Sequence, residues 1–163
     1  RDTDRSRGLG DVYKRQVERL RRYFPGCALT ADMITGFPGE TEADQAAAVA
    51  FLEQVGFAAV HVFPYSRRPG TKADAMPEQL SHAVKSARAH EAQRVADACK
   101  QRYLVQQVGQ TLPVLFETEH DGSWVGHSDN YCLVRAAGDD LRGLVKNVKI
   151  SAVSGQMLVG DLV

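Results

Sequence analysis

Two short apolar segments, residues 28–35 and 58–63, each run directly into a turn rich in glycine and proline. The first turn, Gly-Phe-Pro-Gly, occupies residues 36–39, and the second occupies residues 64–70. Between the segments, residues 42–55 repeat apolar side chains at helical spacing, and a glycine ends the repeat. A strand, a helix and a strand in this order predict a parallel pair, because parallel strands need a crossover connection. Both turns are therefore expected at one rim of an α/β fold, where such folds carry their chemistry.

The pattern changes after a long helix predicted at residues 77–103. From residue 111 onward the helical spacing disappears, and short β-rich runs alternate with turns. The runs that we predict as strands are residues 111–119, 123–127, 131–136, 144–152 and 156–163. Short strands at this density predict a small closed barrel of the OB type, since closure removes exposed strand edges. The expected fold class is therefore α/β followed by all-β.

Three parts are predicted along the chain: a leader at residues 1–16, an α/β unit at 17–105 and a β-barrel at 106–163. The leader is polar and lacks periodicity, so we expect it to have no regular structure. It resembles either read-through sequence at the start of a truncated reading frame or a solvated basic tail, and its composition leaves both interpretations open. Charge also changes at the second boundary: residues 1–105 carry 16 Lys and Arg against 13 Asp and Glu, whereas the remainder carries 4 against 7.

Composition argues against several classes of protein. The chain has 163 residues, of which 44% are hydrophobic, and this suits one ordinary domain or two small ones. No apolar run reaches the ~18 residues of a membrane span and no signal peptide is recognisable, so a cytoplasmic protein is expected by default. Cys27, Cys99 and Cys132 are odd in number and form no C-x-x-C pair, which argues against a disulfide framework and against a zinc ribbon.

The first turn has the composition of a ligand-binding loop. Gly36 and Gly39 let the backbone approach a ligand closely, and Glu40 can accept hydrogen bonds from an amine or a hydroxyl. The alternative is a tight turn between strand and helix, in which the charge of Glu40 suits the positive end of the helix dipole.

The second turn carries an aromatic side chain next to cations. Tyr65 and Arg68 at a strand end can stack on a base and bind an anion, although a solvated basic loop remains the alternative. His61 lies within the apolar segment before this turn and is expected as a hydrogen-bonded core residue. Trp124 is the only tryptophan, and it is expected either to stack on nucleobases or to pack in the core.

Any RNA-binding surface on the barrel must be local, because the charge balance of this unit is negative and nucleic-acid affinity rests mainly on phosphate neutralisation. The basic residues of the unit are Arg135, Arg142, Lys146 and Lys149. We predict that they gather on one face, with Trp124 as a stacking platform and with Lys100 and Arg102 of the preceding helix extending the surface.

The segments at residues 32–41 and 61–71, together with the terminal β-rich unit, resemble the radical S-adenosylmethionine tRNA methylthiotransferases. Two segments are most similar to the threonylcarbamoyladenosine branch: His-Val-Phe-Pro-Tyr-Ser at 61–66 and Gly-His-Ser-Asp-Asn-Tyr at 126–131. The resemblance covers residues 17–163. It implies the C-terminal half of a radical-SAM α/β barrel followed by a TRAM domain, a small five-stranded β-barrel that holds RNA.

The resemblance also implies the activity and the cofactors of a full-length enzyme. Such an enzyme adds a methylthio group to C2 of N6-threonylcarbamoyladenosine, next to the tRNA anticodon, by radical chemistry that needs S-adenosylmethionine and [4Fe-4S] clusters. By their position in the family's motif, Ile34, Gly36 and Glu40 are expected to bind S-adenosylmethionine. The residues expected to join them from the next strand end are Phe63, Tyr65 and Arg68.

The chain lacks the three-cysteine motif C-x-x-x-C-x-x-C of this family, whose thiolates hold the cluster. We therefore expect no catalytic residue, no metal ligand and no activity of the chain by itself. Two other interpretations stay open. In one, the chain is a non-catalytic RNA-binding fragment; in the other, it comes from a methylthiotransferase of the isopentenyladenosine or ribosomal-protein branch.

Overall fold

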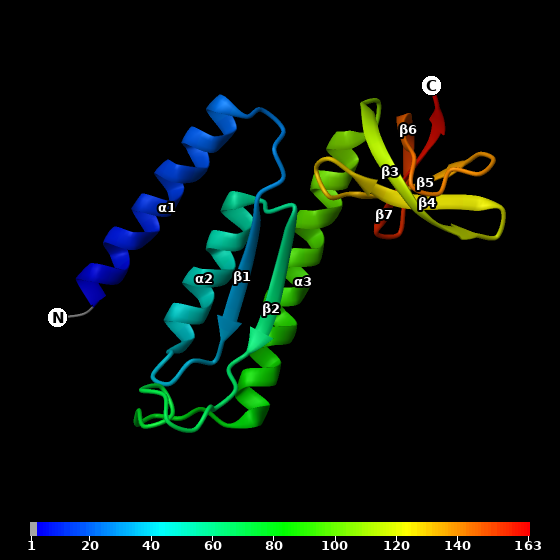
Figure 1. Cartoon of the computed structure of the whole chain (residues 1–163). Coiled ribbons are helices and arrows are strands. Elements are labelled where there is room, and N and C mark those ends of the chain that lie inside the picture. The colour runs from blue at the N-terminus through cyan, green and yellow to red at the C-terminus, as the bar shows by residue number, and fades with distance from the viewer. Residues whose placement is uncertain (1–2) are drawn as a thin grey trace.

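The computed structural model describes residues 3–163, which form two units connected by one long helix (Figure 1). The helices are α1 (Thr3–Tyr23), α2 (Glu42–Val55) and α3 (His82–Gln107). The strands are β1 (Thr30–Thr35), β2 (Ala59–Pro64), β3 (Thr111–His120), β4 (Ser123–Ser128), β5 (Leu133–Ala137), β6 (Val145–Ser154) and β7 (Met157–Leu162). Strands β1 and β2 belong to the first unit, and strands β3 to β7 form the second.

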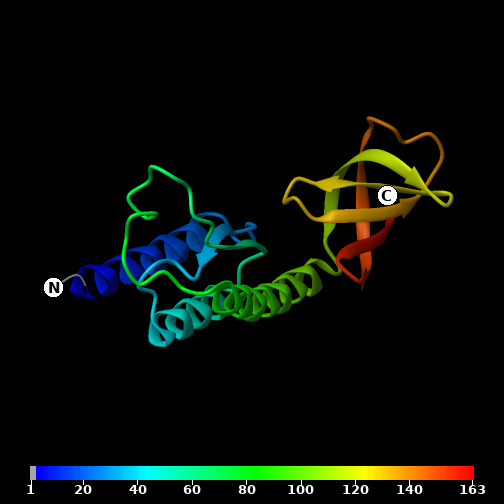
Figure 2. The ribbon, with the colours of Figure 1, turned by 90° about the horizontal axis from the view of Figure 1, so that it is seen from below.

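Strands β1 and β2 form a two-stranded parallel sheet, as the sequence predicted. Thr35 at the end of β1 pairs with Pro64 at the end of β2, so the loops that follow the two strands leave the sheet at the same edge. Helices α2 and α3 cover one face of the sheet, and the apolar side chains packed there include Leu52, Val60 and Ala92. Figure 2 shows these helices below the strands, with the loop after β2 rising on the opposite side.

The other face of this sheet is exposed. Side chains alternate along a strand, so Asp32 and Ile34 of β1 share this face with His61 and Phe63 of β2. All four are exposed, and the rings of His61 and Phe63 stack with their centroids 6.5 Å apart. The expectation that His61 is a core residue is wrong, because the alternation turns its side chain away from the covering helices.

Capping interactions set where the helices begin. Thr41 is the N-cap of α2: its hydroxyl accepts a hydrogen bond from the N–H of Asp44, and the Asp44 carboxylate accepts one from the N–H of Thr41. Helix α3 begins later than the predicted residue 77, because the Ser81 hydroxyl accepts a hydrogen bond from the N–H of Val84 and caps the helix there. Residues 65–81 therefore form a long loop at the carboxyl edge of the sheet.

Helix α1 differs from the expectation that the leader lacks regular structure, since it begins at Thr3. Tyr13, Val17 and Leu20 have i, i+4, i+7 spacing and so share one side of this helix. They line a cavity of about 440 Å³ together with β1 and α2. Residues 17–23 have the pattern of a helix end, and only Tyr13 of the three lies in the polar leader, so no sequence pattern indicated that the helix begins earlier. Residues 1–2 of the predicted leader lie outside the described residues.

Strands β3 to β7 close into a barrel in the order β3-β4-β5-β7-β6. Neighbouring strands are antiparallel except β5 and β7, which are parallel. The core is apolar, and Val114, Phe116, Val134 and Leu158 are fully buried in it. The five predicted strands are confirmed, and their ends differ from the predicted ends by at most two residues.

The C-terminal half of α3 joins the two units. Tyr103 and Leu104 are buried in the same apolar cluster as the barrel core. The Tyr103 hydroxyl donates a hydrogen bond to the carbonyl of Gly26 at 3.0 Å, which ties the segment before β1 to this junction. Lys100 Nζ donates to Oε1 of Gln156, in the turn between β6 and β7, at 2.8 Å.

Within residues 3–163, none of the helices combines the length and the apolar character that a membrane span requires.

Candidate functional site

A cavity of about 530 Å³ opens at the carboxyl edge of the parallel sheet. Its lining consists of Ile34, Phe63, Pro64, Tyr65, Ser66, Arg68, Thr71 and Ala73. Ile34, Phe63, Tyr65 and Arg68 are four of the six residues predicted to bind S-adenosylmethionine, and the structure brings them together. They meet because β1 and β2 are parallel and end at paired residues. Ile34 and Phe63 are 57% and 52% exposed, so their side chains are accessible to a ligand.

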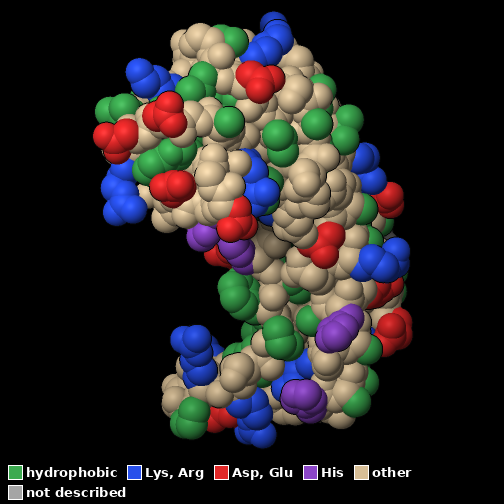
Figure 3. Space-filling view, turned by 90° about the vertical axis from the view of Figure 1, so that its right-hand side faces the viewer, with side chains coloured by type: hydrophobic (Ala, Val, Ile, Leu, Met, Phe, Trp, Pro, Cys, Tyr) green, Lys and Arg blue, Asp and Glu red, His purple; other side chains and the backbone are tan. Residues whose placement is uncertain are grey.

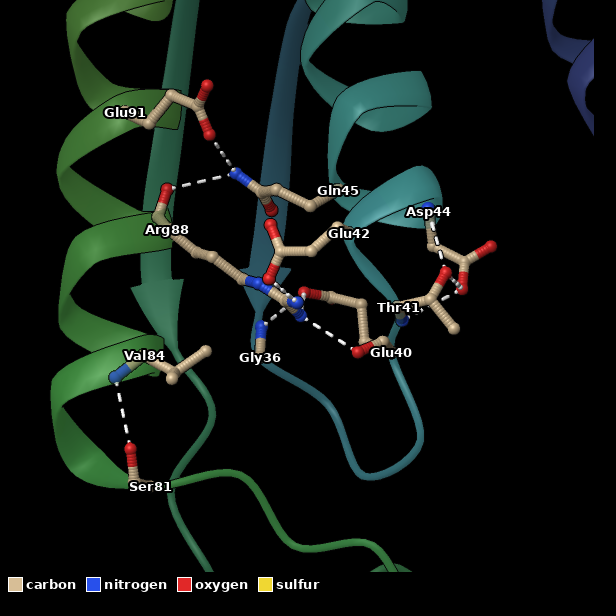
Figure 4. Close-up of polar contacts among 10 residues, drawn as sticks. All are labelled: Gly36, Glu40, Thr41, Glu42, Asp44, Gln45, Ser81, Val84, Arg88 and Glu91. Atoms are coloured by element: carbon tan, nitrogen blue, oxygen red, sulfur yellow. Dashed lines mark hydrogen bonds and ion pairs between the residues drawn. The ribbon is translucent and has the colours of Figure 1, made fainter.

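Gly36 and Glu40, the other two predicted ligand residues, lie in the loop after β1 and contact each other. The N–H of Gly36 donates a hydrogen bond to Oε1 of Glu40 at 2.9 Å. The same oxygen accepts a hydrogen bond from Nη1 of Arg88 at 2.6 Å, and Nη1 also donates to the Glu40 carbonyl at 2.9 Å (Figure 4). The Glu40 side chain, 15% exposed, therefore holds the loop in its observed shape. Contact between Glu40 and a ligand stays a prediction.

Arg88 connects this loop to the start of α2. Its side chain is 7% exposed, and Nη2 donates to Oε1 of Glu42 at 2.6 Å. The hydrogen bond to Glu42 raises the pKa of Arg88, burial acts in the opposite direction, and Glu40 raises the pKa further. Gln45 continues the network by donating to the Arg88 carbonyl and to Oε2 of Glu91. The sequence does not identify Arg88 as part of this site, because a single cation on a distant helix carries no signal that it pairs with Glu40.

Lys85 lies one helical turn before Arg88 and packs on the same loop. Gly36 has φ +71°, and a Cβ at this position would collide with Cγ of Lys85. Only glycine therefore fits between the end of β1 and α3. Nζ of Lys85 lies 5.6 Å from the centroid of the Tyr65 ring, within the range of a cation–π contact. Phe37 packs edge-on against the same ring, with the centroids 5.2 Å apart.

The cavity lining combines aromatic rings with a cation. Small-molecule sites span roughly 300–1,000 Å³, and the cavity volume lies in this range. Within the part of the chain that the structure describes, the Tyr65 hydroxyl is buried without a hydrogen-bond partner, which is uncommon for a buried polar group. The rings of Phe63 and Tyr65 are suited to an adenine, and Arg68 is suited to a carboxylate. S-adenosylmethionine has both groups.

The described residues do not fit an iron–sulfur cluster. Among residues 3–163, no three His, Cys, Asp or Glu side chains come together as a possible metal site. Cys99 and Cys132 are buried, and Cys27 is half-buried. Burial raises the pKa of Cys132, which disfavours the thiolate form that a metal ligand requires.

The barrel corrects the prediction that Trp124 is a stacking platform. Trp124 is 5% exposed and belongs to the apolar core, because its position on β4 points inward. The ring is therefore closed to a nucleobase, and core packing, the alternative role, is the one that the structure supports.

The four basic residues predicted to bind RNA are exposed, but they are spread around the barrel. Lys146 and Lys149 are three positions apart on β6, so their side chains leave opposite faces of the strand. Arg135 lies on β5, which β7 separates from β6, and Arg142 lies in the loop between β5 and β6. Lys149 also donates a hydrogen bond to the carbonyl of Gly109 at 2.6 Å. RNA contact by these residues stays a prediction.

Known proteins match most of this chain. The chain is 35% identical over 146 residues to the threonylcarbamoyladenosine tRNA methylthiotransferase MtaB of Bacillus subtilis (strain 168). It is 39% identical over 155 residues to the tRNA-2-methylthio-N(6)-dimethylallyladenosine synthase of Maricaulis maris (strain MCS10). A protein of the same name from Nitratidesulfovibrio vulgaris (strain DP4) is 36% identical over 158 residues. No family model matches the chain.

These matches cover 86%, 93% and 91% of this chain, but only 32%, 34% and 35% of the relatives. The chain therefore spans about a third of the length of the curated relatives that it matches. The names of the relatives contain two different modified adenosines, and the chain is similarly identical to both kinds of relative. The relatives therefore agree on the enzyme group and differ in the nucleoside. The resemblance drawn from the loop segments is confirmed at the level of the group: over most of its length, the chain is related to the tRNA methylthiotransferases.

Proposed function

We propose that this chain is the C-terminal part of a radical S-adenosylmethionine tRNA methylthiotransferase. In this proposal, the α/β unit is part of the radical-SAM barrel and holds S-adenosylmethionine at the carboxyl edge of β1 and β2. The terminal barrel is a TRAM domain and holds the tRNA. The observation that carries the proposal is the cavity lined by Ile34, Phe63, Tyr65 and Arg68, in a chain related to enzymes of this group.

The residues of the chain bind and orient the cofactor in this proposal. Phe63 and Tyr65 pack against the adenine, and Arg68 pairs with the carboxylate. The left-handed Gly36 lets the loop after β1 pack against Lys85 beside the cofactor. S-adenosylmethionine supplies the radical and the methyl group when a reduced iron–sulfur cluster, held by residues outside this chain, is present. Glu40 and Arg88 hold the loop after β1 in its shape through their hydrogen bonds.

The nucleoside substrate that we propose is N6-threonylcarbamoyladenosine. Two observations support this nucleoside: the amino-acid sequence of residues 61–66 and 126–131, and the relative from Bacillus subtilis, whose name contains this nucleoside. The dimethylallyladenosine nucleoside is the second candidate, because a relative with that name has the higher identity of 39%.

A binding titration tests the cofactor site. We expect S-adenosylmethionine to bind the chain in calorimetry, and Tyr65→Ala and Arg68→Ala each to weaken binding, because each removes a contact worth about 1–3 kcal/mol. Lys72→Ala is the matched control, since Lys72 is exposed in the same loop and is absent from the cavity lining. Equal weakening by Lys72→Ala and Arg68→Ala would show that only the net charge of the loop matters.

A chimera tests the activity and the nucleoside. Residues 17–163 would replace the matching third of MtaB in a Bacillus subtilis strain that lacks the native protein, and mass spectrometry would identify the modified tRNA nucleosides. We expect the methylthio group on threonylcarbamoyladenosine. Its appearance on the dimethylallyl nucleoside would select the second candidate, and an unmodified tRNA pool from a stable chimera would reject both.

A further inference from the structure

Tyr131 carries its ring into solvent from a strained backbone position. It is 85% exposed and has φ +61°, in the left-handed region that bulky side chains rarely adopt. Glycine and asparagine adopt this conformation more easily than tyrosine. A strained residue persists only where its surroundings fix it, and such residues gather at binding sites.

Hydrogen bonds fix the loop that presents Tyr131. Its N–H donates to the carbonyl of Ser128 at 2.9 Å, and the Ser128 hydroxyl donates to Oδ1 of Asn130 at 2.6 Å. Nδ2 of Asn130 then donates to the Tyr103 hydroxyl at 3.2 Å and to Oε1 of Gln107 at 3.1 Å, both on α3. The loop is therefore held against the helix before any ligand arrives, which lowers the entropy cost of binding.

A cavity of about 340 Å³ lies next to this ring, at the junction of the two units. Its polar lining includes Thr30, Lys100, His127 and Asn130, and Tyr131 also lines it. Figure 3 shows that the molecule is hollowed on one side, between the barrel at the top and the loops of the α/β unit at the bottom. The barrel and the loop after β2 also rise on the same side of the sheet in Figure 2.

We propose that an unpaired RNA base stacks on the Tyr131 ring and places its edge in this cavity. Aromatic side chains bind unpaired bases by stacking, and the imidazole of His127 and the ammonium of Lys100 suit the polar edge of a base. The inference rests on the proposed tRNA substrate and adds a contact distinct from the cofactor cavity. It assigns to Tyr131 the stacking role predicted for Trp124.

The charges around this site favour a base over a phosphate. Asp129 lies in the same loop, and Glu117 contacts His127, with Oε2 of Glu117 2.6 Å from Nδ1 of His127. The carboxylate of Asp129, two residues before Tyr131, disfavours a phosphate at this ring. The contact therefore contributes stacking and little counterion release, so its loss should leave the salt dependence of binding unchanged.

The test compares the full chain with Tyr131→Asn, Tyr131→Phe and Tyr23→Asn. Asparagine accepts the left-handed backbone but removes the ring, phenylalanine keeps the ring, and Tyr23 is a second exposed tyrosine, at the end of α1. Each variant is titrated with a tRNA transcript and with a fully paired RNA duplex at several salt concentrations. Thermal unfolding is measured in parallel.

We expect Tyr131→Asn to weaken tRNA binding roughly 5- to 150-fold, with an unchanged salt slope and an unfolding temperature no lower than that of the wild type. Tyr131→Phe and Tyr23→Asn should bind tRNA within about twofold of the wild type, and duplex binding should not depend on Tyr131.

Wild-type tRNA binding that Tyr131→Asn leaves unchanged would overturn this inference and leave the proposed function standing. Equal weakening of tRNA and duplex binding would also overturn it, because no unpaired base would then be involved. Absence of tRNA binding by the wild type would reject both the contact and the proposed RNA-binding role of the barrel.

Discussion

Arg88 stabilises the loop after β1 from a position 48 residues further along the chain. We expect Arg88→Met to lower the free energy of unfolding by about 3–5 kcal/mol, because Glu40 would be left poorly solvated and without its cation. Urea unfolding measures the loss, and amide exchange at Gly36 reports whether the loop opens.

An exposed ion pair in the neighbouring loop provides the control for this prediction. The Arg67 side chain is 58% exposed and lies 2.8 Å from Asp74, so Arg67→Met should lower the free energy of unfolding by about 1 kcal/mol or less. If the two variants lose the same amount, the contacts of Arg88 with Glu40 and Glu42 do not hold the loop.

Gly36 and Gly70 allow the effect of a left-handed backbone to be measured apart from the effect of a steric clash. Both have positive φ, but a Cβ on Gly36 meets Lys85, whereas a Cβ on Gly70 meets open space. Gly70→Ala should lower the free energy of unfolding by about 1–2 kcal/mol through the left-handed backbone alone. Gly36→Ala should lose more, and Lys85→Ala should recover part of the difference. Equal losses in chemical denaturation would mean that Lys85 yields to the added methyl group.

At the scale of elements, the junction between α3 and the barrel should respond to alkaline pH. Burial raises the pKa of Tyr103 to about 12, with the nearby Cys132 adding to the shift and the hydrogen bond from Asn130 opposing it. The unfolded tyrosine ionises near pH 10, so the stabilisation is complete below about pH 10 and is lost as the pH rises towards 12.

Unfolding experiments across this range test the titration of Tyr103. The wild type should lose stability between about pH 10 and 12, whereas Tyr103→Phe should show a smaller loss, because the titrating group is gone. Absorbance of tyrosinate identifies the step. Parallel pH profiles for the two proteins would show that Tyr103 does not control the junction.

Most elements were predictable because they carry a periodic pattern. Helix α2 has the predicted bounds, and the strands follow runs of β-forming residues bounded by turns. The predictions were wrong where a single local contact decides, as at Ser81, which caps α3, or where the apolar stripe is thin, as in α1. His61 was misplaced because an apolar run does not reveal which face of a strand is covered.

The candidate site was predictable only as far as the strand ends define it. Parallel strands bring Ile34, Phe63 and Tyr65 together from the topology alone. The contacts of Arg88 and Lys85 depend on how α3 packs across the sheet, and no local pattern encodes this. Trp124 and Tyr131 show the same limit, since composition does not say which aromatic ring faces outward.

At the scale of the whole molecule, the cysteines predict the outcome of cluster reconstitution. We expect the chain, incubated anaerobically with iron and sulfide, to bind no stoichiometric [4Fe-4S] cluster, because the three-cysteine motif is absent from its sequence. Iron content and visible absorption measure this. A full cluster that disappears in a Cys27→Ser, Cys99→Ser or Cys132→Ser variant would contradict the prediction.

Helix α3 belongs to both units, since Lys85 and Arg88 contact the loop after β1 while Tyr103 and Leu104 pack in the barrel core. Each residue between them adds about 1.5 Å to the distance between the loop after β1 and the barrel, and turns the barrel by about 100° relative to that loop. One inserted residue would swing the barrel by ~100°, whereas seven would move it ~10.5 Å and restore its direction to within ~20°. The helix therefore sets both the distance and the angle between the loop after β1 and the barrel. Insertions and deletions within α3 should for this reason be poorly tolerated.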